Sequence, residues 1–331
     1  MKRFMALLSI ISLLTVVLAG CGSTAATTAS NSSEKTVKVG IIQIVEHPAL
    51  DAARKGFLET LAANGYTEGK NLTVDYKNAQ GDQSSLNTIA QQFASEKPNL
   101  VLAIATPSAQ AIAAASSTIP ILITAVTDPV AAKLVTSNEK PGTNITGTTD
   151  MNPLKQQFEL LKKLVPQAKK IGVIYNAGEV NSQVQVKMAK DVAAAMGLQI
   201  VEATIASTAD VQQAAESLVG KVDVVYVPTD NMVVSAAPTV LQVTNKAKIP
   251  VISGESSVVD KGALGTIGIN YENLGKQTGE MALKVLKGAK PQDMAIESQK
   301  DFDTVINKTS AALLGITIPD DLKNAKFVET K

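Results

Sequence analysis

A strand-turn-helix plan that occurs twice constrains this sequence more than any other feature. Residues 40 to 57 (GIIQIVEHPALDAARKGF) join a continuous apolar run to a polar turn and then to apolar residues at helical spacing. The same plan returns from Gly172, as GVIYNAGEVNSQVQVKMAK. An Ile-Pro pair that opens a further apolar run follows each copy, with Pro120 80 residues after Gly40 and Pro250 78 residues after Gly172. The repetition predicts two similar α/β lobes rather than one long sheet.

Apolar runs of strand length alternate with helical patterns in both halves of the chain. The expected strands start at Val37, Leu72, Leu100 and Ile121 and, in the second half, at Lys170, Leu198, Val222 and Pro250. Such alternation is typical of βαβ units, whose parallel sheets are covered by helices on both faces. One of the helices is expected over residues 233–247. The predicted fold class is therefore α/β, with two doubly wound parallel-sheet lobes joined by a multi-strand hinge.

Three extended segments are expected to cross between the lobes, at residues 144–149, at residues 264–270 and around residues 302–306. They assign residues 37–147 plus 271–300 to lobe I and residues 148–270 plus 301–331 to lobe II. Several crossings make a hinge, whose few backbone rotations can open and close a cleft between the lobes.

The amino-terminal residues have the pattern of an export signal. Lys2 and Arg3 precede an apolar run of about 16 residues, shorter than the roughly 20 residues of a membrane-spanning helix. The run ends in LAGC, which resembles the lipobox of bacterial lipoproteins, so residues 1–20 are expected to be removed and Cys21 to be lipidated. A simple amino-terminal anchor helix is the alternative. Residues 21–36 are rich in Ser, Thr and Ala and predict a flexible tether, with the protein exported and lipid-anchored at the outer face of the bacterial cell membrane.

Polar residues follow the strand ends of the first lobe, where open parallel sheets bind their ligands. The candidates are Gln43, Glu46, His47, Thr106, Pro107, Ser108, Thr127 and Asp128. Glu46 could meet a ligand ammonium group, whereas His47 either contacts the ligand or only begins a helix. Thr106 and Ser108 stand at a helix amino terminus, whose N–H groups and hydroxyls suit a carboxylate where arginine is scarce. Asp128 either pairs with an amino group or closes an Asx turn.

The second lobe supplies a matching set of loop residues. Its candidates are Asn176, Glu179, Asn181, Thr229, Asp230, Asn231 and Glu255. Because unpaired buried carboxylates repel one another, Asp128, Asp230 and Glu255 cannot all be desolvated against one amine. Asp230 is the preferred partner of a ligand ammonium group, and Asn231 beside it adds neutral donors and acceptors.

The chain resembles the type I solute-binding proteins of bacterial ABC importers. The motifs that carry the resemblance are IIQIVEHPALDAARKGF, ATPSAQ, AVTDPVAAKLV, NITGTTD and VPTDNMV, and they are similar to the subfamily associated with tryptophan or tyrosine uptake. The resemblance implies a small amino acid-like solute, with an aromatic amino acid favoured, captured in a cleft by hinge closure. It also implies ABC permease and ATPase subunits as partners, and we expect a monomer.

Alternative functions remain open on the sequence alone. A receptor that reports ligand occupancy to a membrane signalling partner would have the same features, and a sugar or a nucleoside could replace the amino acid. Sugar sites commonly stack the sugar on aromatic rings, and this chain has no Trp. The lining of an aromatic pocket could include Tyr175, Tyr271 and Met232, or these residues could belong to the core.

Composition and motifs exclude several other classes. The net charge of +1 does not indicate nucleic acid binding. One His and one Cys cannot build a His/Cys metal site, although a carboxylate site could be built. We expect neither a metal nor a cofactor. The sequence contains neither a G-x-S-x-G elbow nor a phosphate-binding G-x-x-x-x-G-K-[ST] loop, and we expect no enzymatic activity.

Overall fold

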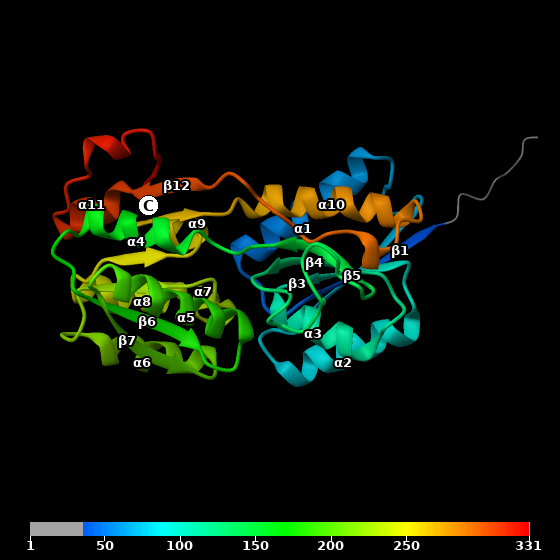
Figure 1. Cartoon of the computed structure of the whole chain (residues 1–331), viewed down its shortest axis with the longest axis horizontal. Coiled ribbons are helices and arrows are strands. Elements are labelled where there is room, and N and C mark those ends of the chain that lie inside the picture. Colours follow the sequence, from blue (N-terminus) through cyan, green and yellow to red (C-terminus); the bar gives the residue numbers. More distant parts are fainter. Residues whose placement is uncertain (1–35, 331) are drawn as a thin grey trace, which may run out of the picture. The chain divides into compact units, whose positions relative to one another are not determined.

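The computed structural model describes residues 36–330, which contain two sheets (Figure 1). Lobe I is built on a six-stranded sheet of order β11-β5-β4-β3-β1-β2, and lobe II on a seven-stranded sheet of order β13-β12-β10-β9-β8-β6-β7. The predicted α/β class with two doubly wound lobes is confirmed. The expected signal peptide, Cys21 and the tether as far as residue 35 lie outside the described residues.

Lobe I follows the βαβ pattern predicted for it. Its strands are β1 (Val37–Gln43), β2 (Leu72–Asn78), β3 (Leu100–Ile104), β4 (Ile121–Val126), β5 (Ile145–Thr149) and β11 (Glu297–Ser298). Its helices are α1 (Pro48–Ala63), α2 (Gln83–Glu96), α3 (Thr106–Ala115), α10 (Tyr271–Leu286) and the 3-10 turn η2 (Pro291–Asp293). Helices α1 and α10 pack together on one face of the sheet, and α2 and α3 cover the other (Figure 1). Strands β3 and β4 are buried along their whole length, as expected for a sheet covered on both sides.

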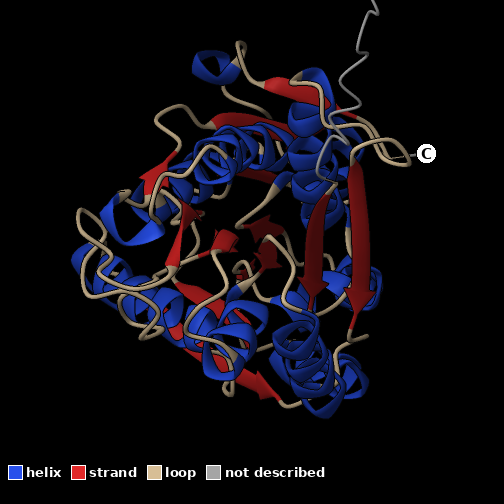
Figure 2. Ribbon diagram, turned by 90° about the vertical axis from the view of Figure 1, so that its right-hand side faces the viewer, coloured by secondary structure: helices blue, strands red, loops and turns tan. Residues whose placement is uncertain are grey.

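Lobe II repeats this arrangement. Its strands are β6 (Lys170–Asn176), β7 (Gln199–Ile205), β8 (Val224–Val227), β9 (Val251–Ser253), β10 (Gly265–Gly268), β12 (Asp303–Asn307) and β13 (Lys326–Val328). Its helices are α4 (Leu154–Leu164), α5 (Val180–Ala195), α6 (Val211–Leu218), α7 (Asn231–Ser235), α8 (Ala237–Lys246), α9 (Ser256–Asp260), α11 (Lys308–Leu314), and the 3-10 turns η1 (Thr208–Asp210) and η3 (Asp320–Leu322). Figure 2 shows strands of the molecule bordered on the outside by helices.

Alternate side chains of the central strand β6 serve the two cores of lobe II. Ile171 and Val173 belong to the cluster that includes Phe158 of α4, whereas Ile174 belongs to the cluster that includes Leu218 of α6. Because successive side chains of a strand point to opposite faces, one continuous apolar strand can hold a helix layer on each side. The ring of Phe158 also packs edge-on against Tyr226 of β8, with 5.2 Å between the ring centroids.

The chain passes between the two sheets three times, and the predicted crossing segments are themselves strands. Residues 144–149 form β5, which pairs in parallel with β4, and the crossing follows at residues 150–153. Residues 264–270 contain β10, and the segment around residues 302–306 contains β12. Strand β12 pairs antiparallel with β10, an exception to the predicted all-parallel sheet. Extended segments at a lobe boundary gain backbone hydrogen bonds by joining the sheet edge, which the sequence pattern alone did not indicate.

The single helix predicted over residues 233–247 was wrong. The structure has two helices there, α7 and α8, which meet at Ala236. Pro238 lies in the first turn of α8, where its missing N–H group costs no helical hydrogen bond. Proline begins a helix more readily than it continues one, so Pro238 accounts for the break between α7 and α8.

Candidate functional site

Predicted residues of both lobes meet at a small cavity between the carboxyl ends of the two sheets. In this closed arrangement the cavity has a volume of only about 10 Å³. Its lining comprises His47, Leu50 and Ala125 of lobe I, Asp150 and Tyr271 beside the crossings, and Asn181, Thr229, Asn231, Val234 and Glu255 of lobe II. We call this space the inner cavity. Its wall combines polar and apolar side chains, as ligand sites do, and the lobes would have to move apart to admit a solute.

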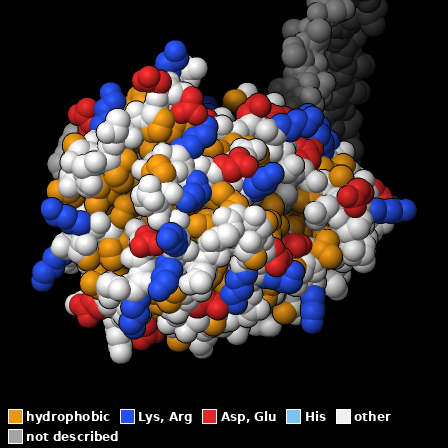
Figure 3. Space-filling view, turned by 60° about the vertical axis from the view of Figure 1, so that its left-hand side comes forward, with side chains coloured by type: hydrophobic (Ala, Val, Ile, Leu, Met, Phe, Trp, Pro, Cys, Tyr) orange, Lys and Arg blue, Asp and Glu red, His pale blue; other side chains and the backbone are white. Residues whose placement is uncertain are grey.

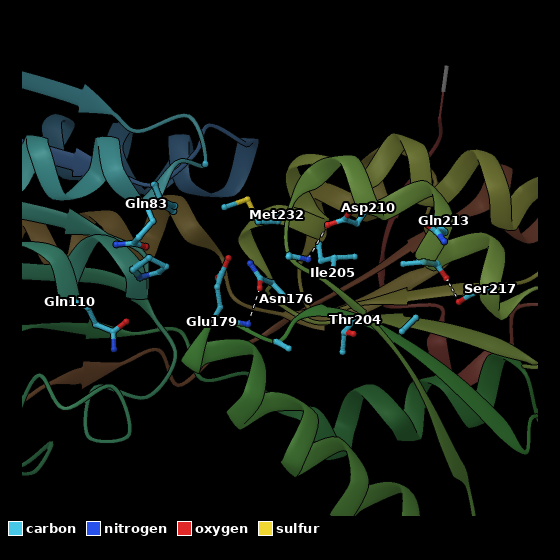
Figure 4. A pocket seen from close by; sticks show the side chains of 18 residues that line it. Gln83, Gln110, Asn176, Glu179, Thr204, Ile205, Asp210, Gln213, Ser217 and Met232 are labelled. Carbon is cyan, nitrogen blue, oxygen red and sulfur yellow. Dashed lines mark hydrogen bonds between the residues drawn. The ribbon is translucent and has the colours of Figure 1, made fainter.

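A second and larger space of about 920 Å³, which we call the open groove, is also lined by both lobes. Figure 4 shows Gln83 and Gln110 of lobe I on one side, and Glu179 and Met232 of lobe II on the other. Asn176 and Pro107, two further predicted residues, also line the open groove.

The amino termini of several helices lie at the loops that carry the predicted residues. His47 precedes α1, Glu179 precedes α5 and Glu255 precedes α9, each as the cap residue. Thr106 is the first residue of α3, which follows directly on β3. At these four connections a strand is followed by the start of a helix. This brings free N–H groups and polar side chains to the same edge of each sheet.

Many buried polar atoms at these loops have no hydrogen-bond partner within residues 36–330. Eleven buried side-chain nitrogen or oxygen atoms are unpaired in this way, and eight of them belong to the loops around the two spaces. The eight are Oε1 of Gln43, Nδ1 of His47, Oγ1 of Thr106, Oγ of Ser108, Oδ1 of Asp150, Oε1 of Glu179, Oδ1 of Asn181 and Oγ1 of Thr229. Native proteins leave few such atoms unpaired, so their concentration marks the place where ligand atoms are needed.

Acidic groups dominate the electrostatics of the inner cavity. Burial raises the pKa of Glu255 to about 7, and burial also raises the pKa of Asp150. Burial and the charge of Lys261 lower the pKa of His47 to about 3, so its imidazole is neutral at physiological pH. The described lining contains no Lys or Arg. A cationic ligand group would therefore relieve the cost of burying these carboxylates.

Glu179 beside the open groove behaves similarly. Burial and the neighbouring charge of Asp230 raise the pKa of Glu179 to about 8. Its Oε2 accepts hydrogen bonds from the side-chain amides of Asn181 and Asn231, while Oε1 is one of the unpaired atoms.

Asp230, the preferred ammonium partner on sequence grounds, is occupied by donors of this chain. Its Oδ1 caps α7 by accepting from the N–H groups of Met232 and Val233. Its Oδ2 accepts from the N–H group of Asn176 and from the hydroxyl of Ser182, both at 2.6 Å. Four donors fill a carboxylate, so Asp230 organises the loops rather than offering a free oxygen.

Three other predicted residues also have partners within the protein. Glu46 is exposed and accepts a hydrogen bond from the hydroxyl of Tyr76 at 2.9 Å, so it does not reach the inner cavity. Asp128 caps its own turn through the N–H groups of Val130 and Ala131, which is the Asx turn given as its alternative. The side chain of Thr127 is buried, and its carbonyl group accepts from the hydroxyl of Thr149.

Two alanines with positive φ lie at adjacent strand ends of lobe I. Ala105 follows β3 with φ of 75°, and Ala125 in β4 has φ of 56°. The register between β4 and β5 shifts at this point, and Ala125 lines the inner cavity. Residues other than glycine rarely adopt such φ values, and such strain tends to occur at functional sites.

Asp150 is the polar residue of the inner cavity that the sequence did not predict, and Leu50, Ala125 and Val234 are the cavity's unpredicted apolar residues. The predicted residues lie in loops that join a strand to a helix in the same lobe, whereas Asp150 follows β5 at the first crossing. Treating residues 144–149 as a strand would have marked Asp150 as one more polar residue at a strand end. Of the three residues proposed to line an aromatic pocket, Tyr271 lines the inner cavity and Met232 the open groove. Tyr175 instead donates to Glu202.

Within residues 36–330 no group of three or more His, Cys, Asp or Glu side chains is arranged to hold a metal ion. No helix in the same range combines the length and the apolar composition needed to cross a bilayer. Figure 3 shows Lys or Arg side chains interspersed with Asp and Glu over the face in view, with no single-sign patch on it.

Comparison with known proteins gives consistent matches over nearly the whole chain. The family model described as ABC transporter substrate binding protein matches residues 38–328. The tyrosine-binding protein of Clostridioides difficile (strain R20291) is 46% identical over 303 residues, which cover 90% of this chain and 88% of that protein. These matches place the chain among solute binders rather than enzymes, and the resemblance seen in the sequence motifs is confirmed.

Two solved structures are similar in different degrees. One is an ABC domain in complex with L-Trp from Streptococcus pneumonia, with 39% identity and a TM-score of 0.86 over 89% of this chain and 100% of that chain. The other is the ligand-free, open structure of a substrate binding protein from Clostridium difficile, with 50% identity and a TM-score of 0.69 over the same shares. The chain therefore belongs to the family of ABC transporter substrate-binding proteins and has the type I periplasmic-binding-protein fold.

Proposed function

We propose that this protein is the extracytoplasmic, lipid-anchored receptor of an ABC importer and that it captures an aromatic amino acid by closure of its two lobes. The observation that carries the proposal is the group of unpaired buried polar atoms in the loops around the inner cavity and the open groove. They provide acceptors for an ammonium group and donors for a carboxylate, the two groups that every free amino acid presents.

The carboxylate end of the ligand is assigned to the start of α3. The hydroxyls of Thr106 and Ser108 are buried and have no partner within the described part of the chain. Helix α3 has 10 residues, so its amino terminus presents free N–H groups and a favourable dipole to an anion. The ammonium end is assigned to the carboxylates of the inner cavity, whose apolar wall of Leu50, Ala125 and Val234 suits an aromatic ring.

The comparisons support an aromatic solute and a closing motion. The 46% identical relative is a tyrosine-binding protein, and the structure from Streptococcus pneumonia holds L-Trp. The present structure matches the L-Trp complex better than the ligand-free open structure, although it shares more sequence with the latter. A ligand that contacts both lobes favours the closed form through its differential affinity, which is the state a transporter would recognise.

The test is a binding screen by calorimetry and thermal shift with purified protein. The ligands are L-tyrosine, L-tryptophan, L-phenylalanine, other amino acids, common sugars and nucleosides. We expect a response confined to aromatic amino acids, and a ligand at 100 times its Kd stabilises the fold by about 2.7 kcal/mol. Binding of a sugar or a nucleoside alone would overturn the proposed ligand. Uptake of labelled ligand by cells with and without the gene separates import from signalling, because a signalling receptor would leave uptake unchanged.

A further inference from the structure

Asp150 and Tyr271 connect two of the three crossings between the lobes. Asp150 follows β5 at the first crossing, and Tyr271 begins α10 after the second. The hydroxyl of Tyr271 donates a hydrogen bond of 2.7 Å to Oδ2 of Asp150. Both residues line the inner cavity, and they are only 3% and 5% exposed. The hinge thus contributes a side-chain pair directly to the wall of the site.

Asp150 has fewer hydrogen-bond donors than Asp230 or Glu179, and like Glu179 it keeps one buried oxygen without a partner in the described residues. Asp230 accepts four hydrogen bonds from protein donors, and Glu179 accepts two from side-chain amides. Glu255 accepts from the hydroxyl of Ser257. Asp150 accepts a hydrogen bond from Tyr271, and the side chain of Thr127 also lowers its pKa, yet within residues 36–330 its Oδ1 has no hydrogen-bond partner. A buried carboxylate with a free oxygen is costly unless a cationic donor reaches it.

The charged and titratable groups around Asp150 leave room for one positive charge. Glu255 lies close enough for the charge of Asp150 to raise the pKa of Glu255, and Tyr271 is held neutral by burial. His47 on the opposite wall is neutral, and Lys261 acts on His47 and Glu255 from outside the lining. Two adjacent carboxyl groups cannot both ionise cheaply against each other, so a ligand ammonium group would stabilise the ionised form.

We infer that the carboxylate of Asp150 accepts a hydrogen bond from the ammonium group of the bound amino acid. Tyr271 positions the carboxylate of Asp150, so the positive charge of the ligand is held at the hinge. This assignment rests on the proposed function. It predicts that occupancy is sensed where the lobes rotate, because the ligand ammonium group would add a third member to the existing hydrogen bond between Asp150, after β5, and Tyr271, at the start of α10.

The test compares L-tyrosine with 3-(4-hydroxyphenyl)propanoate, which has the same ring and carboxylate but lacks the amine. Asp150→Asn should weaken L-tyrosine binding about 30-fold or more, because a charge-assisted contact is lost, and should change binding of the amine-free analogue less than about threefold. Asp191→Asn, at an exposed residue of α5, is the matched control and should change neither affinity. Equal loss for both ligands would mean a structural role for Asp150, and no loss for either would assign the ammonium group elsewhere; both results overturn the inference.

A second variant keeps the test valid if Asp150→Asn does not fold. Tyr271→Phe removes the hydrogen bond to Asp150 and so raises the pKa of that carboxyl group, because this hydrogen bond favours its ionised form. The pH below which L-tyrosine binding weakens should therefore move upward in Tyr271→Phe, while the analogue's profile stays the same. An unshifted L-tyrosine profile would overturn the inference. A wild-type protein that binds no amino acid would refute the proposed function itself, a result distinct from the others.

Discussion

The carboxylate of Asp230 accepts a hydrogen bond of 2.6 Å from the backbone N–H group of Asn176, which ties the loop after β8 to the loop after β6. Asp230→Asn places an amide in a site that four donors surround. We expect the free energy of unfolding to fall by about 3 kcal/mol, because buried donors lose a charged acceptor. Urea unfolding followed by circular dichroism measures the loss.

The same experiment separates a structural role of Asp230 from a ligand contact. The substitution Asp191→Asn at the surface should leave stability within about 0.5 kcal/mol of the wild type. If Asp230→Asn kept full stability but lost affinity for L-tyrosine selectively over its amine-free analogue, Asp230 would be the ammonium partner after all.

Helices α1 and α10 approach so closely that glycines are required where they touch, among them Gly275 of α10 and Gly56 of α1. A Cβ atom at Gly275 would lie 1.9 Å from the carbonyl oxygen of Ala53, which is backbone and cannot move aside. Gly275→Ala should therefore lower the free energy of unfolding by about 3 kcal/mol or more, although alanine is the better helix former. Chemical denaturation measures the effect. The exposed Glu280→Ala in the same helix is the control, and equal stability of the two variants would show that the helices can separate without cost.

The parts of the fold that depend on local pattern were predictable from the sequence. Strand β3 reads LVLAI and is buried throughout, so a continuous apolar run was enough to place it in a covered parallel sheet. Pairing partners at the lobe edges were harder, because the short strands β5 and β12 carry polar residues and depend on neighbours distant in sequence. Long-range pairing leaves little mark on the strand itself.

The candidate site was predictable in outline but not in the role of each carboxylate. Strand-end position marked seven of the eight loop residues around the two spaces whose buried polar atoms lack partners in the described chain. It did not reveal that Glu46 turns to Tyr76 or that Asp230 is filled by four donors. Whether a carboxylate is free depends on donors from other loops, and these are set by tertiary packing.

Stability of the ligand-free protein should depend on pH through Glu255. Burial raises its pKa from 4.5 to about 7, so the folded protein holds this proton more tightly than the unfolded chain does. The stabilising effect of protonation is complete below pH 4.5 and is lost as pH rises through 7. Glu255→Gln has no proton to lose, so the stability difference between variant and wild type should change by about 3 kcal/mol in the variant's favour across this range.

Urea unfolding at intervals from pH 4.5 to pH 8 checks this dependence on Glu255. The wild type will retain some slope, because Glu179, whose pKa is raised to about 8, acts in the same direction. Glu280→Gln, at an exposed position, should parallel the wild type. A stability difference between Glu255→Gln and wild type that stays constant with pH would contradict the assigned pKa.

Cys21 provides a test of membrane anchoring that is independent of the ligand. It is the single cysteine of the chain. If it is lipidated, Cys21→Ser should move the protein from the membrane fraction to the medium or the soluble extracytoplasmic fraction. Immunoblots of fractionated cells measure the distribution, with Ser23→Ala as the control. Retention of Cys21→Ser in the membrane would favour the uncleaved anchor helix.

The start of α3 makes the last prediction. Ser108→Ala removes a buried hydroxyl that has no partner within the described residues, and the smaller side chain fits the same space. Because the hydroxyl is proposed to donate to the ligand carboxylate, its loss should weaken L-tyrosine binding about tenfold, equivalent to about 1.4 kcal/mol. Any weak binding of tyramine, which lacks the carboxylate, should be unaffected, and Ser84→Ala in α2 serves as the control. Calorimetry with both ligands decides the matter: equal weakening for L-tyrosine and tyramine would place the carboxylate away from α3.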